Sequence, residues 1–183
     1  MRWTAIDEGR HDDARGVESW GFGFQCPDAT GEIRLAFDVA NARASFIVDL
    51  SIARFGRIVV ADESVALPRA QAGLEIRADG LWASLYCETP FEHWSLGLEA
   101  FGLRIEADAM PSDAVGGATA WDALIGERLA VGFDVEWELS GPPEPLVDGN
   151  GYRQVGTIFG DLLVVRDRLE VDGRGWRDHW WGT

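Results

Sequence analysis

The sequence contains no lysine, so all of its positive side-chain charge at neutral pH comes from sixteen arginines. Against these stand 31 acidic residues, which leave a net charge of −15. A surface of this sign repels the phosphates of nucleic acids, and no basic stripe interrupts it. We therefore expect no nucleic acid partner.

Cysteine is almost as scarce, with only Cys26 and Cys87. Two thiols make neither a disulfide framework nor a zinc site, so we expect both to be reduced and half-buried. The chain also lacks His-x-His, His-Glu-x-x-His and paired-cysteine spacings, and we expect no metal site. A glycine-rich phosphate loop and a Gly-x-Ser-x-Gly elbow are missing too, so no cofactor is indicated.

Long hydrophobic runs are absent. None approaches the roughly 18 residues of a membrane-spanning helix, and we expect no membrane span. Residues 1–8 lack the basic and apolar regions of a secretory signal peptide, which favours a cytoplasmic protein. No Pro-rich or Ser-rich linker divides the 183 residues, a length typical of one domain.

Large apolar side chains are abundant, and they recur with a period of two. Ile33, Leu35 and Phe37, for example, alternate with charged or small residues, which predicts a strand with one buried face. The same pattern predicts strands at 20–25, 33–39, 46–52, 74–78, 81–87, 93–100, 103–107, 131–139, 152–165 and 169–171. Only residues 118–127 have a helical pattern, and residues 140–151 predict a loop.

About ten strands in adjacent hairpins, with one short helix, predict an all-β fold. We expect an antiparallel barrel or half-barrel, because curling is the best way for such a sheet to hide its edges. A flat sandwich is the competing architecture. A barrel of this size can hold one small ligand. Residues 1–16 form a polar leader in which we expect His11 to be solvated, and residues 17–174 form the β domain.

A first candidate cluster lies in and just after a proline turn. Glu88, Glu92 and His93 are close in sequence to Phe91 and Trp94. A carboxylate beside an imidazole can set its tautomer and raise its basicity, as general-base chemistry requires. The alternative is an exposed hairpin with His93 at the start of a strand.

A second cluster closes the chain, where Arg177, Asp178 and His179 lie between tryptophans. Adjacent residues of a strand point to opposite faces. If the segment is extended, Arg177 and His179 share one face, and Asp178 shares the other with Trp176 and Trp180. An Asp178–His179 catalytic dyad is therefore disfavoured. Either residue would need a partner from elsewhere, with the 88–93 segment as the candidate, and the alternative is a purely structural role.

Three segments, at 18–22, 87–94 and above all 175–182, resemble one family. It is the lipocalin-like family that contains the hydroxyneurosporene synthases (carotenoid 1,2-hydratases), the AttH proteins and some fungal Diels–Alder cyclases. In its actinobacterial branch the closing motif typically reads Arg-Asp-His-Ser-Trp-Gly. This chain has Trp180 where the family usually has Ser.

The resemblance implies a protein of two lipocalin-like β-barrel domains, with the Arg-Asp-His motif near their junction. Residues 17–174 would then be the first domain. Residues 175–183, with Arg177 at the junction, would begin a second domain, supplied in cis or by a partner chain. The implied ligands are apolar, isoprenoid-like or polyketide-like, and some members of the family add water or cyclise without a cofactor.

Three hypotheses follow. The leading one is a lipocalin-like domain that binds an apolar small molecule through Trp20, Phe22, Trp94, Tyr152, Trp176 and Trp180. The second is a cofactor-independent hydratase, isomerase or cyclase, with Asp178, Glu88 or Glu92 as the acid and with His93 and His179 as further catalytic candidates. The third is a structural half-barrel that completes a partner domain.

Overall fold

The computed structural model describes residues 3–11, 16–69, 72–105, 124–147 and 150–182. Their secondary structure consists of ten strands and one 3-10 turn, so the predicted all-β class is confirmed. The elements are η1 (Ala5–Glu8), β1 (Val17–Gln25), β2 (Ala29–Asp38), β3 (Arg43–Ile52), β4 (Gly56–Ala66), β5 (Leu74–Ala78), β6 (Leu81–Thr89), β7 (His93–Ile105), β8 (Glu127–Pro145), β9 (Gly151–Val164) and β10 (Asp167–Trp181). No helix among these residues is long and apolar enough to span a membrane.

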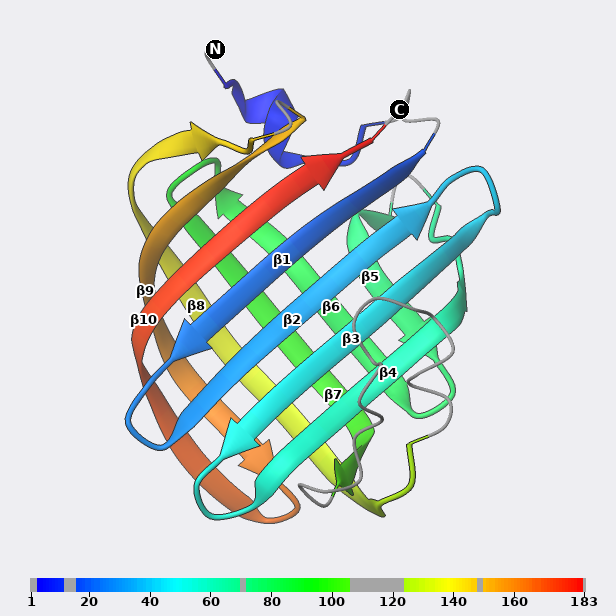
Figure 1. Cartoon of the computed structure of the whole chain (residues 1–183), viewed down its shortest axis with the longest axis vertical. Helices are drawn as coiled ribbons and strands as arrows, with labels where there is room; N and C mark the ends of the chain where they lie inside the picture. Colours follow the sequence, from blue (N-terminus) through cyan, green and yellow to red (C-terminus); the bar gives the residue numbers. More distant parts are fainter. Residues whose placement is uncertain (1–2, 12–15, 70–71, 106–123, 148–149, 183) are drawn as a thin grey trace.

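All ten strands belong to one antiparallel sheet, in the order β4-β3-β2-β1-β10-β9-β8-β7-β6-β5. Most neighbours are consecutive hairpins, and β10 returns to pair with β1. The end of β7 also pairs with the start of β4, through residues 103–105 and 57–59. This pairing closes β1–β4 and β7–β10 into a ring, while β5 and β6 extend the sheet beyond it (Figure 1).

The period-two pattern places the core inside this ring. In β2, Ile33, Leu35 and Phe37 are fully buried, while Glu32 and Arg34, on either side of Ile33, are exposed. Burial of each large apolar side chain stabilises the fold by roughly 1.5–3 kcal/mol relative to its exposure. The alternation therefore determines which face of each strand points inward.

Several boundaries differ from those expected. The segment predicted as a strand at 93–100 and residues 103–105 of the one predicted at 103–107 form the single strand β7, while residues 106–107 lie outside the described residues. The predicted loop at 140–151 is partly strand, because β8 continues to Pro145 past a register irregularity between Ser140 and Glu144. Of the predicted helix, residues 118–123 lie outside the described residues, and residues 124–126 are not helical before β8 begins at Glu127.

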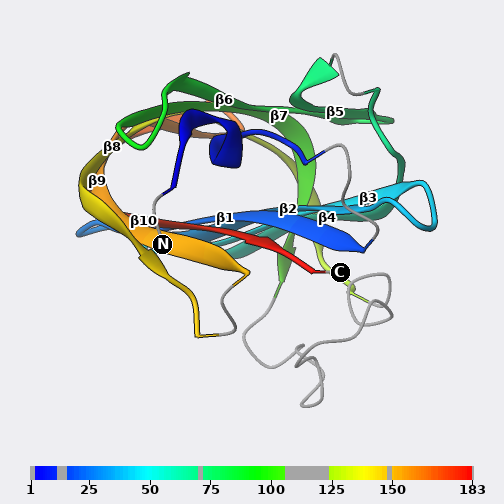
Figure 2. The ribbon, with the colours of Figure 1, turned by 90° about the horizontal axis from the view of Figure 1, so that it is seen from above.

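The closing motif is part of the last strand, which runs to Trp181. It pairs with β1 on one side and β9 on the other, so the backbone hydrogen bonds of both neighbours hold it in place. The first described residues lie at the same end of the barrel as the end of β10 (Figure 1). Viewed from above, η1 lies within the ring of strands at that end (Figure 2).

Candidate functional site

The barrel end beneath η1 contains a buried ion pair. Arg177 of β10 donates from Nη1 to Oε2 of Glu8 and from Nη2 to the Tyr152 hydroxyl, 2.9 Å away. Arg177 and Tyr152 are fully buried and Glu8 is 2% exposed. The backbone N–H of Phe91 donates to the other oxygen of Glu8, at 2.9 Å. Since a buried charge requires a partner, each member of this group depends on the others.

Aromatic rings surround the guanidinium. Its Cζ lies 4.7 Å from the Trp94 ring centroid, 5.1 Å from that of Tyr152 and 5.8 Å from that of Phe22. Burial raises the pKa of Tyr152, and the neighbouring Arg177 opposes this rise. The phenol is therefore neutral, and its hydroxyl both accepts from Arg177 and donates to the backbone oxygen of Asp7, at 3.1 Å.

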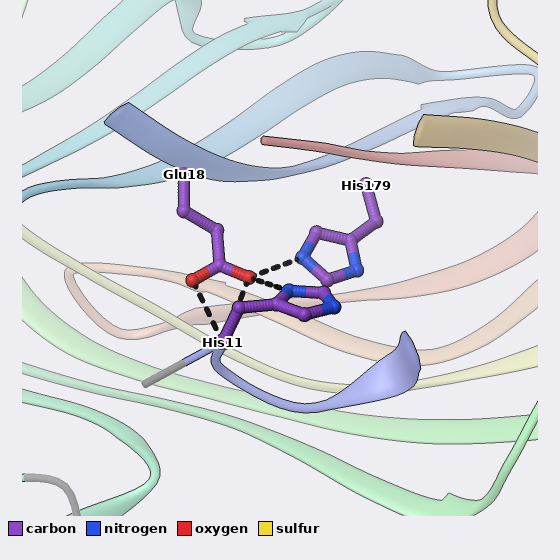
Figure 3. A group of neighbouring side chains, drawn as sticks. All are labelled: His11, Glu18 and His179. Atoms are coloured by element: carbon purple, nitrogen blue, oxygen red, sulfur yellow. Dashed lines mark hydrogen bonds and ion pairs between the residues drawn. The ribbon is translucent and has the colours of Figure 1, made fainter. Parts of the chain in front are cut away.

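His179 lies two residues after Arg177 in β10, on the same inward face and beside the ion pair. Its Nε2 is 2.9 Å from Oε1 of Glu18, and its Nδ1 is 2.9 Å from the backbone oxygen of Asp7. The same Glu18 oxygen lies 2.6 Å from Nδ1 of His11. Figure 3 shows both imidazoles directed at this carboxylate. Burial lowers the pKa of His179, against the opposing effect of Glu18. The neutral imidazole is consequently favoured at this position.

Two more rings enclose the histidines. Trp20 stacks on His179 with a centroid distance of 4.7 Å. Trp181 lies 4.4 Å from the His11 ring and 4.9 Å from that of His179. The expectation that His11 is solvated is wrong, because its side chain is only 17% exposed and contacts a fully buried carboxylate.

Asp178 lies on the outer face of β10, opposite His179. Its carboxylate is 3.9 Å from Arg34 and rests on Gly21 of β1. Trp176 covers β1 in the same way, and a Cβ on Gly23 would lie 2.2 Å from its indole. Asp178 and His179 therefore lie on opposite faces of the sheet and do not form a catalytic dyad. Trp176 and Trp180 are half-buried and do not join the interior aromatic residues.

The candidate cluster near the proline turn also lies on the outer surface. Nε2 of His93 is 2.7 Å from Oε2 of Glu136, and the Ser95 hydroxyl, which has one hydrogen to donate, lies within hydrogen-bond distance of both Glu136 and Glu88. The side chain of Glu92 is exposed. His93 and Glu88 thus come together through Glu136 and Ser95, but the contact between His93 and Glu136 is partly exposed to solvent, where such pairs contribute about 0–1 kcal/mol.

Inside the barrel, three buried tryptophans carry indole N–H groups that have no hydrogen-bond partner among the described residues. They are Trp20, Trp94 and Trp137, and Nε of Arg177 is unpartnered as well. Phe22 connects the set, since its ring centroid lies 5.4 Å from Trp94 and 5.3 Å from Trp137. A buried indole N–H normally has an acceptor. The interior is therefore unusual in holding four buried donors without one.

The hollows described for this chain lie on its outer surface. One of about 580 Å³ crosses β6 to β9 and is mainly apolar, with Trp82, Phe101 and Leu163 among its lining residues. Another, of about 390 Å³, is lined partly by Trp176. None of the residues proposed from the sequence as catalytic lines either hollow.

Sequence reasoning missed Glu8, His11, Glu18 and Trp181. Only Glu18 had a usable signal: it occupies an inward-facing position of β1, in phase with Trp20, where an acidic residue is unexpected. Glu8 and His11 lie in a stretch without periodicity, and nothing local indicates that they pack against the barrel.

No protein-family model matches the sequence, and no curated protein matches it. Among solved structures, the chain is similar to the crystal structure of CghA with Sch210972, at 11% identity and a TM-score of 0.45. The alignment covers 90% of this chain and 45% of that one, so this chain spans less than half the length of CghA.

Proposed function

We propose that this protein binds an apolar small molecule that carries at least one acceptor oxygen, in the interior of its β-barrel. The observation that carries the proposal is the set of buried, unpartnered donors formed by Trp20, Trp94, Trp137 and Nε of Arg177. A carbonyl or carboxylate oxygen within reach of these groups would satisfy them, and the surrounding rings would contact the apolar body of the ligand.

The charge distribution of the interior favours a ligand with conjugated or carbonyl-rich chemistry. The Arg177 guanidinium lies 4.7 Å from the ring centroid of Trp94, at the edge of the aromatic interior. It can attract a carboxylate or a polarised carbonyl, while the indole faces accept an unsaturated chain. An isoprenoid-like or polyketide-like acid or ketone has both features.

Since the described hollows are external, entry of a ligand requires the interior side chains to rearrange or residues 3–11 to move from the barrel end. Catalysis would need a carboxylic acid that reaches this interior. Asp178, Glu88 and Glu92 lie on the outside, so an enzyme built on this site would have to use Glu8 or Glu18, both of which are buried.

The test is a titration of metal-free protein with all-trans-retinoic acid, an apolar polyene with a carboxylate, followed by quenching of tryptophan fluorescence. We expect saturable quenching. Trp137→Phe keeps an aromatic ring, though a smaller one, and removes the N–H donor. It should weaken binding by roughly tenfold, the effect of one hydrogen bond. Trp176→Phe on the outer face is the matched control and should bind like the wild type.

Quenching that does not saturate with folded protein contradicts the proposal, and so does equal weakening in both variants. Should Trp137→Phe fail to fold, Trp94→Phe removes a second interior donor and serves the same purpose.

On the family resemblance alone, we further propose that the chain is the first of two lipocalin-like domains. The reading frame after Thr183 tests this form of the proposal. An in-frame continuation with a second strand-rich region would support it, and a stop codon would contradict a second domain in cis. A stable, monodisperse monomer on size exclusion would contradict a half-barrel that requires a partner.

A further inference from the structure

Three side chains from distant parts of the chain converge at the barrel end. His11 follows η1, Glu18 is the second residue of β1 and His179 is near the end of β10 (Figure 3). Their potential ligand atoms all lie within 4.8 Å of one another. Glu18 and His179 are fully buried, and the His11 side chain is 17% exposed.

The hydrogen-bond roles around His179 do not balance within the protein. Its two ring nitrogens face two acceptors, the backbone oxygen of Asp7 and the carboxylate of Glu18, each 2.9 Å away. A neutral imidazole has one N–H and one lone pair. One of its two contacts therefore sets a lone pair against an oxygen, unless a cation or an additional proton lies between them.

The charge of Glu18 also favours a bound cation at this cluster. Its neighbour Glu8 is compensated by the buried guanidinium of Arg177. Among the described residues, the Glu18 carboxylate contacts the backbone N–H and the ring of His11 and the ring of His179, none of which is a permanent cation. A buried carboxylate without a permanent positive partner is costly, and a bound cation would remove that cost.

We propose that His11, Glu18 and His179 form a binding site for a divalent transition metal, with Zn²⁺ as the best match. The ligand atoms would be Nδ1 of His11, a carboxylate oxygen of Glu18 and Nε2 of His179. Two imidazoles and one carboxylate are a donor set that zinc takes at about 2.0–2.2 Å, with further positions left for water or a ligand oxygen.

Asp7 would orient both histidines. Its backbone oxygen accepts from Nδ1–H of His179 once Nε2 holds the metal, as the second nitrogen of a metal-bound histidine usually requires. Its Oδ1 lies 3.9 Å from Nε2 of His11, on the side away from Glu18. Thr4 fixes Asp7 through its backbone N–H and its hydroxyl, which donate to Oδ2 at 2.6 and 2.9 Å.

The metal would join the N-terminal segment to the first and last strands of the barrel. Its ligands come from residues that are up to 168 positions apart (179 − 11). Binding would thus hold residues 3–11 over the barrel end, whether or not a small molecule binds in the interior. This inference does not depend on the proposed function.

The chain offers an internal control, because it contains three histidines and the third, His93, lies outside the site. The experiment is a calorimetric titration of EDTA-treated full-length protein with ZnCl₂, with the absorption spectrum of the Co²⁺ form and the melting temperature as further measurements. We expect one equivalent of Zn²⁺ to bind. The absorption spectrum should be that of a four- or five-coordinate Co²⁺ ion, and the melting temperature should be higher with Zn²⁺ than without it.

His11→Ala should lower the Zn²⁺ affinity by more than about tenfold while the protein stays folded, because His11 is at the edge of the cluster. His179→Ala should abolish binding, and His93→Ala should leave it unchanged. Failure of Zn²⁺, Co²⁺ and Mn²⁺ to bind the folded protein would overturn the proposal and leave a proton-sharing cluster instead. Binding that survives His11→Ala, or that is lost in His93→Ala, would overturn it as well.

Discussion

Arg177 in the last strand and Glu8 in the N-terminal segment form a buried ion pair across 169 positions of sequence. The pair attaches residues 3–11, whose only secondary structure is η1, to the interior of the barrel end. It also explains why the closing motif is ordered, since its inward-facing side chains are covered from above by η1 rather than left at a free end.

Removal of one partner of this pair should destabilise the fold strongly. In Glu8→Gln, a buried guanidinium loses its counter-charge, which typically costs about 3–5 kcal/mol in the free energy of unfolding. The double variant Glu8→Gln/Arg177→Met should lose less than the sum of the single losses, because no charge is then left unpaired. Urea denaturation measures all three variants.

The exposed pair of Arg168 and Asp161 provides the comparison. Arg168→Gln should leave the free energy of unfolding nearly unchanged, because solvent screens this pair. A Glu8→Gln protein that is as stable as Arg168→Gln would contradict the role assigned to Glu8.

Deletion of residues 1–11 should destabilise the domain beyond the loss caused by Glu8→Gln. The deletion uncovers Arg177, Tyr152 and His179 and removes the hydrogen bonds from Tyr152 Oη and His179 to the Asp7 oxygen. Hydrogen exchange of β10 amides in the truncated chain is the measurement, and faster exchange is expected. Unchanged protection would mean that the segment is a dispensable tail.

Gly175→Ala should cost about 1–3 kcal/mol in the free energy of unfolding by overpacking the interior. A Cβ at this inward-facing position would lie 2.5 Å from Nε1 of Trp137, whose ring is fully buried, so neighbouring core side chains would have to shift with it. Gly97→Ala is the matched control on β7. Its Cβ would lie 3.0 Å from the far end of the partly exposed Trp82, so a smaller loss is expected.

Cys87 should react slowly with iodoacetamide in the folded protein. Burial, with a further contribution from Glu8, raises the pKa of this thiol from 9.0 to about 12. The nucleophilic thiolate is therefore rare near pH 8. In a Cys26→Ser background, urea should accelerate the alkylation of Cys87 sharply, and equal rates with and without urea would contradict this assignment.

The same shift has a consequence for stability. The folded state holds the Cys87 proton more tightly than the unfolded state, so the stabilisation is complete below pH 9.0 and is lost as the pH rises toward about 12. The free energy of unfolding should fall over this window less steeply in Cys87→Ala than in the wild type.

Sequence periodicity was sufficient for the fold class and for the direction of most side chains. In β2, alternation correctly places Phe37 on the buried face, and in β10 it correctly separates Arg177 and His179 from Asp178. Alternation did not predict which face of β10 is buried, since Trp176 and Trp180 were expected to bind the ligand and are only half-buried. It failed where local signals conflict. Proline and glycine at 141–145 predicted a loop, yet an irregular continuation of β8 pairs with β9 there.

The candidate site could be predicted from the sequence only in part. Which face His179 occupies is a local property, because it depends only on the phase of one strand. Which groups it meets is not local: His11 and Glu8 come from a segment without any pattern, and Glu18 reaches His179 only because β1 pairs with β10.

By itself, then, the sequence determined an all-β chain with aromatic inward faces and a charged closing strand. That follows because the alternation of side chains between the two faces of a strand depends only on neighbouring residues. Only the tertiary structure decided that the ring closes through β4 and β7, that η1 covers one end, and that His11, Glu18 and His179 share one buried point. Such contacts depend on strand register and chain return over more than a hundred residues, which no local spacing encodes.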